Sequence, residues 1–195
     1  MRQNNSKLSS KAASFRHNEK GSIKHGDSVV IVGAGLSGLC LTQGLLREGF
    51  DVQVYERDPS ADTRKQGYRI TIDEHGAEAL EQCLPSHLFE AVLATTFSPG
   101  EEGYFRFTNE NLGEIFSLSF KDDNKPNKPF GQVDRATLRK IMLSGIEDRV
   151  HFGKAAERVE VRQDGAVLYL TDGSAVRASV VIGADGIHSA LRKQL

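Results

Sequence analysis

The sequence predicts an α/β protein in which a parallel sheet is combined with an antiparallel β-meander. An apolar, β-branched run at 28–33 passes through glycines into a helical pattern at 36–49, and a second apolar run follows at 51–56. This is the layout of a βαβ unit. Later, the segment 158–186 contains two Asp-Gly turn signals and partly alternating polar and apolar residues, which are typical of antiparallel strands.

The βαβ unit is expected to lie at the centre of the fold. "SVVIVG" is apolar without alternation, as in a strand that is covered on both faces. The helix that follows has leucines on most sides and ends at Gly49, a residue that commonly terminates helices. Because the connections are very short, the two flanking strands should pair in parallel.

Three glycines, Gly33, Gly35 and Gly38, lie where the first strand turns into the helix. A helix start presents free N–H groups and the positive end of the helix dipole, so it can bind a diphosphate if no side chain intervenes. Gly33 permits the tight turn, Gly35 the approach of the diphosphate, and Gly38 the close packing of helix on strand. The amides of Leu36 and Ser37 are the expected donors.

Glu56 ends the second strand, 21 residues after Gly35. A carboxylate at this position can accept both hydroxyls of an adenosine ribose and would repel a 2′-phosphate, so NAD or FAD is predicted rather than NADP. The alternative is a turn that only allows close helix packing, with Glu56 as a solvated strand end. That alternative leaves the clustering of three glycines unexplained.

Arg135 and Asp185 are two further candidates for binding. Arg135 opens a helix, where a cation is unfavourable unless an anion such as a cofactor phosphate lies beside it. The alternative is an ion pair with Asp134 or Asp73. Asp185 ends the apolar strand "SVVIGADG" at the carboxyl edge, where ligands of open α/β sheets bind. Taken alone, Asp185-Gly186 also reads as a simple turn.

The middle of the chain is expected to alternate short helices with strands. Strands are predicted at 68–72, 103–108, 113–120 and 130–133, helices at 74–83, 86–94 and 134–146, and polar loops at 60–67 and 121–129. In the last helix Leu138, Ile141, Met142 and Ile146 form one apolar stripe, and Asp134 is the expected N-cap.

The segment between a strand near Val150 and the strand "SVVIGADG" is expected to be the meander, because Asp164-Gly165 and Asp172-Gly173 both favour hairpin turns. A domain that binds only a nicotinamide dinucleotide normally crosses over with helices at this point. The meander therefore favours FAD over NAD.

Composition excludes several classes of protein. The 195 residues are 38% hydrophobic and 26% charged with a net charge of −1, and no apolar run is long enough to span a bilayer. Residues 1–26 carry six Lys/Arg against one Glu and are predicted to be a disordered leader. Because this charge does not continue into the folded part, nucleic-acid binding is not expected.

The two cysteines, Cys40 and Cys83, form no CxxC pair, which argues against a disulfide framework and against a zinc site. No metal is therefore expected. A reducing, cytoplasmic setting is the better interpretation, while the basic leader leaves organellar targeting as an alternative.

The motifs "GAGLSG", "YERD", "VDRATLRKIM" and "GADGIHSALR" occur in the order typical of class A flavoprotein monooxygenases of the p-hydroxybenzoate hydroxylase type. The chain resembles this family from about residue 28 to its C-terminus, and "GYRITID" looks most like the group that includes the tetracycline-inactivating monooxygenases. The resemblance implies a Rossmann-like FAD-binding domain at 27–195, with the start of a second, β-rich substrate layer at about 98–132.

The resemblance also implies roles for individual residues. The three glycines would hold the FAD diphosphate and Glu56 the adenosine ribose, while Arg57 would lie against the adenine. Arg135 would contact the ribityl–diphosphate region. Asp185 would serve both FAD and the docking of an external nicotinamide.

Other polar residues of these motifs are given no catalytic role. Arg192 is expected to be structural, and His188 and Ser189 to be surface and turn residues. Arg64 could contact NAD(P)H. Two alternatives are equally good: Lys65 makes this contact instead, or Arg64 is simply a solvated surface residue. No catalytic side chain is identified, because in this family the cofactor carries the chemistry.

The implied reaction is the reduction of FAD by NAD(P)H, then reaction with O₂ to a flavin hydroperoxide, which passes one oxygen atom to an aromatic or polyketide-like small molecule. The family's later Gly-Asp motif is not found before Leu195. We therefore expect an open edge on the first sheet, and a C-terminal portion or complementing chain that is needed for activity. The alternatives are a non-catalytic FAD- or nucleotide-binding module and an NAD-dependent dehydrogenase.

Overall fold

The computed structural model of the chain describes residues 26–63, 68–97, 104–119 and 129–194. The helices are α1 (Leu36–Arg47), α2 (Glu74–Cys83), α3 (Ser86–Thr95) and α4 (Arg135–Leu143), with short 3-10 helices at Glu147–Arg149 and Arg192–Gln194. The strands are β1 (Ser28–Val32), β2 (Asp51–Glu56), β3 (Arg69–Asp73), β4 (Tyr104–Thr108), β5 (Glu114–Ser119), β6 (Pro129–Asp134), β7 (Val150–Phe152), β8 (Ala156–Arg162), β9 (Gly165–Leu170), β10 (Ala175–Ala178) and β11 (Val180–Gly183).

Three sequence-based predictions fall wholly or largely outside these ranges. They are the leader at 1–26, the role of Arg64, and the loop at 121–129.

A four-stranded parallel sheet forms the centre of the molecule, in the order β11-β1-β2-β7. β1 lies between two neighbours, and its residues from Val29 to Val32 are at most 3% exposed. The prediction from the unbroken apolar run is therefore confirmed. Within the described chain, β11 pairs with β1 alone, so its other side is an open edge of the sheet.

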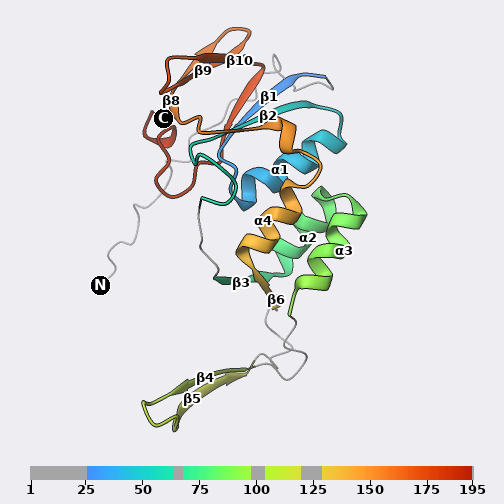
Figure 1. Cartoon of the computed structure of the whole chain (residues 1–195), viewed down its shortest axis with the longest axis vertical. Coiled ribbons are helices and arrows are strands. Elements are labelled where there is room, and N and C mark those ends of the chain that lie inside the picture. The colour runs from blue at the N-terminus through green and yellow to red at the C-terminus, as the bar shows by residue number, and fades with distance from the viewer. Residues whose placement is uncertain (1–25, 64–67, 98–103, 120–128, 195) are drawn as a thin grey trace, which may run out of the picture.

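The antiparallel sheet β10-β9-β8 covers one face of this parallel sheet, where the meander was predicted (Figure 1). Both Asp-Gly turns are present, and Gly165 and Gly173 have φ values of 139° and 86°, which favour glycine. Leu168 and Leu170 of β9 pack against Val30 and Val32 of β1. The meander therefore buries the face that a helix covers in a simple dinucleotide-binding fold.

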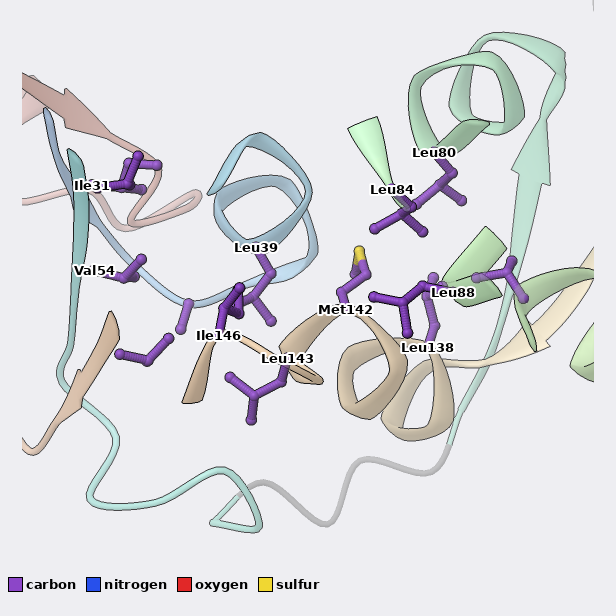
Figure 2. Packing of buried hydrophobic residues seen from close by; sticks show 14 of the residues in the cluster. Ile31, Leu39, Val54, Leu80, Leu84, Leu88, Leu138, Met142, Leu143 and Ile146 are labelled. Carbon is purple, nitrogen blue, oxygen red and sulfur yellow. The ribbon is translucent and has the colours of Figure 1, made fainter. Parts of the chain in front are cut away.

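Helices cover the opposite face. Side chains from the sheet, α1, α2 and α4 meet in one continuous apolar cluster, in which Ile31 and Val54 of the sheet lie towards Leu39 and Met142 of the helices (Figure 2). The amide of Gln43, buried in α1, donates to the main-chain oxygens of Met142 at 2.8 Å and Ser144 at 3.1 Å. α1 thereby holds the C-terminal end of α4.

The prediction for the end of α4 was wrong by one turn. The helix ends at Leu143 instead of residue 146, because Ser144 is extended and Gly145 takes a φ of 80°. Ile146 is nevertheless buried, at 4% exposed, so the apolar stripe persists past the last helical residue.

Two small antiparallel sheets complete the described chain. β3 pairs with β6 beneath the helices, and the β4–β5 hairpin projects away from the body of the molecule (Figure 1). The Phe107 and Phe116 rings stack on this hairpin with centroids 4.2 Å apart, and both side chains are close to half exposed. The assignment of this region to a substrate layer stays a prediction.

Candidate dinucleotide-binding cleft

A cleft of about 740 Å³ opens at the carboxyl ends of β1, β2 and β11. The glycine turn, the end of β2, one side of α4 and the turn after β11 form its walls. Of the nine predicted site residues, seven line this cleft: Gly33, Gly35, Leu36, Glu56, Arg57, Arg135 and Asp185. Ser37 instead lines a depression along β11, and Gly38 is buried.

The three glycines have different surroundings. Gly33 has a φ of 107°, and a Cβ there would lie 2.5 Å from the oxygen of Ala184. A Cβ on Gly38 would lie 2.0 Å from the oxygen of Gly33, so only glycine lets α1 pack this closely on the turn. Gly35 differs, because a Cβ there would meet no heavy atom within 4 Å. It faces open space in the cleft.

Gly35 is also the N-cap of α1, and it offers no side-chain hydrogen bond to the helix start. The first-turn amides of a helix have no partner within the helix itself. A glycine cradle that a Cβ would fill, in front of a helix start without a side-chain cap, suits a diphosphate group. This observation fits the predicted cofactor.

Glu56 is buried, at 6% exposed, and reaches the same turn from β2. Its Oε2 accepts a hydrogen bond from the Ala34 N–H at 2.7 Å, and its Oε1 accepts one from the Asp58 N–H at 2.9 Å. The alternative of a solvated strand end is therefore wrong. Each carboxylate oxygen still has a second lone pair with which it can accept a hydroxyl.

Arg139 was missed in the sequence analysis. Its Nε donates to the Ala34 oxygen at 2.9 Å and its Nη1 to the Ala61 oxygen at 2.6 Å. The guanidinium carbon also lies 5.9 Å from the centre of the Phe152 ring. The available signal was its spacing, because Arg139 is four residues after Arg135 and so lies on the same face of α4.

The start of α4 is capped as predicted. Asp134 accepts hydrogen bonds from the Thr137 N–H and hydroxyl, both at 2.8 Å, and these bonds lower the pKa of its carboxyl group. Arg135 follows at the first helical position, where its main-chain N–H donates to the Tyr68 oxygen at 3.1 Å. It lines the cleft, and its contact with a cofactor stays a prediction.

Asp185 both lines the cleft and stabilises a turn. Its Oδ2 accepts from the Ala190 N–H at 2.8 Å and from the Leu191 N–H at 3.5 Å. Burial acts to raise the pKa of Asp185, but hydrogen bonds from the Ser189 side chain and from main-chain amides outweigh it and lower the pKa. The structural reading of this turn is thus supported, while its role towards FAD stays a prediction.

The remaining residues of that motif make structural contacts. Arg192 donates through Nη2 to the Ile187 oxygen at 2.7 Å, and its main-chain N–H donates to Ser189 Oγ at 2.9 Å. Ser189 is buried and His188 exposed.

Charge is separated along the cleft. Arg135, Arg139 and Lys140 are on α4, and Lys140 pairs with Asp62 at 3.4 Å. The carboxylate of Glu56 lies at the end of β2. The cleft thus has positive charge along α4, where Lys140 is already paired with Asp62 and Arg139 is bound to main-chain oxygens, and a separate acceptor for hydroxyls at Glu56.

Two further properties concern the whole described chain. Its His, Cys, Asp and Glu residues form no cluster that could hold a metal ion. Within the same residues, no helix is both long enough and apolar enough to cross a bilayer.

A parallel sheet, an open glycine turn at a helix start and a buried acid on the next strand define a dinucleotide-binding α/β domain. Residues 27–195 match the family described as "FAD binding domain", and the chain belongs to this family. Its cofactor is FAD.

Two of the matching relatives are named as monooxygenases. The dual O-methyltransferase/FAD-dependent monooxygenase CTB3 of Cercospora beticola is 35% identical over 85% of this chain and 19% of its own length. The 6-methylsalicylate 1-monooxygenase of Aspergillus terreus is 35% identical over 86% of this chain and 39% of its own length. The chain therefore spans well under half of the length of these relatives.

Solved structures agree. Klebsiella pneumoniae HpxO, complexed with FAD and uric acid, has a TM-score of 0.69 and 26% identity over 87% of this chain and 41% of its own. The tetracycline destructase Tet(51) has a TM-score of 0.64 over 87% of this chain and 41% of its own, but at 20% identity it supports only the fold. The predicted resemblance to class A FAD-dependent monooxygenases is confirmed.

Proposed function

We propose that this chain is the FAD-binding portion of a monooxygenase that hydroxylates an aromatic or polyketide-like small molecule, with NAD(P)H as electron donor and O₂ as co-substrate. The carrying observation is the glycine turn at Gly35, open to the cleft and joined to the buried carboxylate of Glu56. The names of the relatives support the choice of substrate class, since 6-methylsalicylate is an aromatic ring compound.

The residues that would hold FAD follow from the cleft. The amides of Leu36 and Ser37 would donate to the diphosphate, with Gly33, Gly35 and Gly38 keeping the turn clear of side chains. When bound, FAD supplies the electron-transfer and oxygen chemistry.

Around the diphosphate, Glu56 would accept the ribose hydroxyls and Arg57 would lie against the adenine. Arg135 would contact the ribityl–diphosphate region, and Asp185 would lie near both FAD and a docking nicotinamide. The protein's own task in this part of the chain is thus to bind and orient, and no side chain here is proposed to transfer a proton.

Surface features support a role for further polypeptide in the complete enzyme. The β4–β5 hairpin exposes Phe107, Phe116 and Leu118, and β11 has an open edge beside an apolar depression. A two-stranded hairpin is marginal by itself unless another layer covers it. We propose that a C-terminal portion or a complementing chain supplies that layer.

A second candidate function is a non-catalytic FAD-binding module, which the same open surfaces favour for the 195-residue chain alone. It predicts that this chain binds FAD but oxidises no NADPH until the complementing portion is added. A cytoplasmic location also belongs to the proposal, and the two free thiols, Cys40 and Cys83, support it.

The proposal is tested by titrating FAD into the purified chain while flavin fluorescence and visible absorbance are recorded. Glu56→Gln keeps the size of the side chain but has only one acceptor oxygen, whereas the Glu56 carboxylate accepts from two N–H groups. We expect the FAD dissociation constant to rise at least about tenfold, since one hydrogen bond to a charged group contributes about 1.5–3 kcal/mol.

Glu56→Arg should abolish FAD binding. The matched control is Glu48→Arg, which makes the same charge change on an exposed residue at the other end of α1. Wild-type affinity in both Glu56 variants would exclude this acid as the ribose ligand.

A further inference from the structure

The main chain of Ala34, between two glycines of the turn, is held from two sides by side chains of opposite charge. Glu56 accepts from its N–H at 2.7 Å, and Arg139 donates to its oxygen at 2.9 Å. Ala34 itself is 0% exposed. We infer that Arg139 is a positioning residue that fixes the glycine turn in its FAD-binding shape, and that it does so through the main chain and not as a phosphate ligand.

The second hydrogen bond of Arg139 extends this effect to another wall of the cleft. Its Nη1 donates to the oxygen of Ala61 at 2.6 Å, in the segment that follows β2. Ala34 and Ala61 both line the cleft. One guanidinium group therefore joins α4, the glycine turn and the segment after β2.

The position of Arg139 is itself well determined. Its guanidinium lies over the ring of Phe152, with 5.9 Å between its central carbon and the ring centre. Gln43 ties the C-terminal end of α4 to α1 through the oxygens of Met142 and Ser144. Because α1 begins at the glycine turn and Gln43 of α1 holds the C-terminal end of α4, the guanidinium has a fixed base from which to position that turn.

Lysine cannot replace this arrangement. A guanidinium presents several N–H donors in a rigid plane, whereas an ammonium is a single point of charge on a flexible stem. A lysine at this position would keep the positive charge near the cleft but could not reach the oxygens of Ala34 and Ala61 in the same way. Arg139→Lys therefore changes the hydrogen-bond geometry while it keeps the positive charge.

The inference rests on the proposed FAD-binding role of the cleft and names a residue that makes that site rigid. A turn that samples other shapes binds its ligand with an affinity reduced by the fraction of time that it spends in the competent shape. Loss of a hydrogen bond to a charged group corresponds to about a tenfold to hundredfold change in an equilibrium constant. We expect the FAD dissociation constant to rise by about this factor in Arg139→Lys.

The experiment compares the 195-residue wild-type chain with Arg139→Lys, Arg139→Ala and Lys140→Met. Lys140→Met is the charge control, because it removes a cation from the same side of α4 and the same cleft without touching the two main-chain oxygens. FAD affinity is measured by fluorescence titration, and hydrogen exchange of the FAD-free chains is followed by mass spectrometry over residues 33–36 and 58–63.

Both Arg139 variants are expected to lose FAD affinity and to exchange faster in these two segments, whereas Lys140→Met should change the dissociation constant by less than about threefold, as expected for an exposed ion pair. Millimolar ethylguanidinium should restore part of the affinity of Arg139→Ala, which a general loss of stability would not allow. Wild-type FAD affinity in Arg139→Lys, or wild-type exchange in both segments, would overturn the inference.

The two proposals can fail separately. If the wild-type chain binds no FAD, the proposed function fails, and the exchange of the FAD-free chains still tests the positioning role of Arg139. If the wild-type chain binds FAD and Arg139→Lys binds it equally well, the proposed function stands and the inference about Arg139 is wrong. If the wild-type chain binds no FAD, faster exchange in Arg139→Lys but not in Lys140→Met supports the positioning role.

Discussion

Gly35→Ala should separate the binding of FAD from the stability of the fold. The added methyl group meets no heavy atom within 4 Å, and the backbone at this position, with φ −75° and ψ 179°, is open to alanine. Alanine is a poorer N-cap than glycine. It also reduces the conformational entropy of the unfolded chain, which stabilises the folded state by about 0.4–1 kcal/mol. These effects oppose each other, so the free energy of unfolding should change by less than about 1 kcal/mol.

The effect on FAD should be much larger. The methyl group would occupy the open space in front of the α1 start, where the diphosphate is proposed to bind. Two charge-assisted hydrogen bonds, at about 1.5–3 kcal/mol each, would be lost or lengthened. We therefore expect at least about a hundredfold weaker binding, which corresponds to about 3 kcal/mol.

Gly38→Ala is the matched comparison, because it adds the same methyl group one turn further into the same helix. A Cβ there would lie 2.0 Å from the oxygen of Gly33, and this oxygen cannot move away without opening the turn. Overpacking of this kind costs about 1–3 kcal/mol or more, so both stability and FAD affinity should fall. Urea unfolding of the FAD-free chains and fluorescence titration with FAD measure the two quantities. Wild-type FAD affinity in a stably folded Gly35→Ala chain would show that the diphosphate does not bind in front of Gly35.

Three further predictions concern other parts of the chain. Burial, followed by the neighbouring Cys83, raises the pKa of the Cys40 thiol to about 12, so iodoacetamide at pH 8 should modify Cys40 far more slowly in the folded than in the unfolded chain, as peptide mass spectrometry would show. The pKa of Asp185 is lower in the folded than in the unfolded chain, so its contribution to the free energy of unfolding should be complete well above pH 4 and should disappear as the pH falls through the folded pKa. Urea unfolding should therefore show a smaller difference in the free energy of unfolding between Asp185→Asn and wild type at pH 3 than at pH 7. Phe116→Ser on the projecting hairpin should leave the FAD dissociation constant within about twofold of wild type, and a larger change in the titration would show that the hairpin contributes to the cleft.

The parts of the fold that depend on local patterns could be predicted from the sequence. Gly33, Gly35 and Gly38 indicated the turn, since Gly33 and Gly38 meet steric requirements that show in the residue type and Gly35 leaves the space before the helix start open. The Asp-Gly pairs at 164 and 172 indicated the meander for the same reason. Asp134 could be identified as an N-cap because its partner, Thr137, is only three residues away.

The parts that depend on contacts between distant residues could not be predicted. Arg139 binds Ala34, which is 105 residues away, and no local pattern announces that contact. Glu56 was expected as a ribose ligand, but its bond to the Ala34 N–H depends on the register between β1 and β2. The meeting of Cys40 and Cys83 likewise depends on how α2 packs against α1.

The most direct test of the account is a hydrogen-exchange footprint of FAD on the wild-type chain. If FAD binds at the glycine turn, exchange should slow after FAD is added in peptides that cover 33–38, 56–58 and 135–140, and it should not change in β9 and β10. Protection confined to the meander or to the β4–β5 hairpin, or none in the glycine turn under saturating FAD, would contradict it.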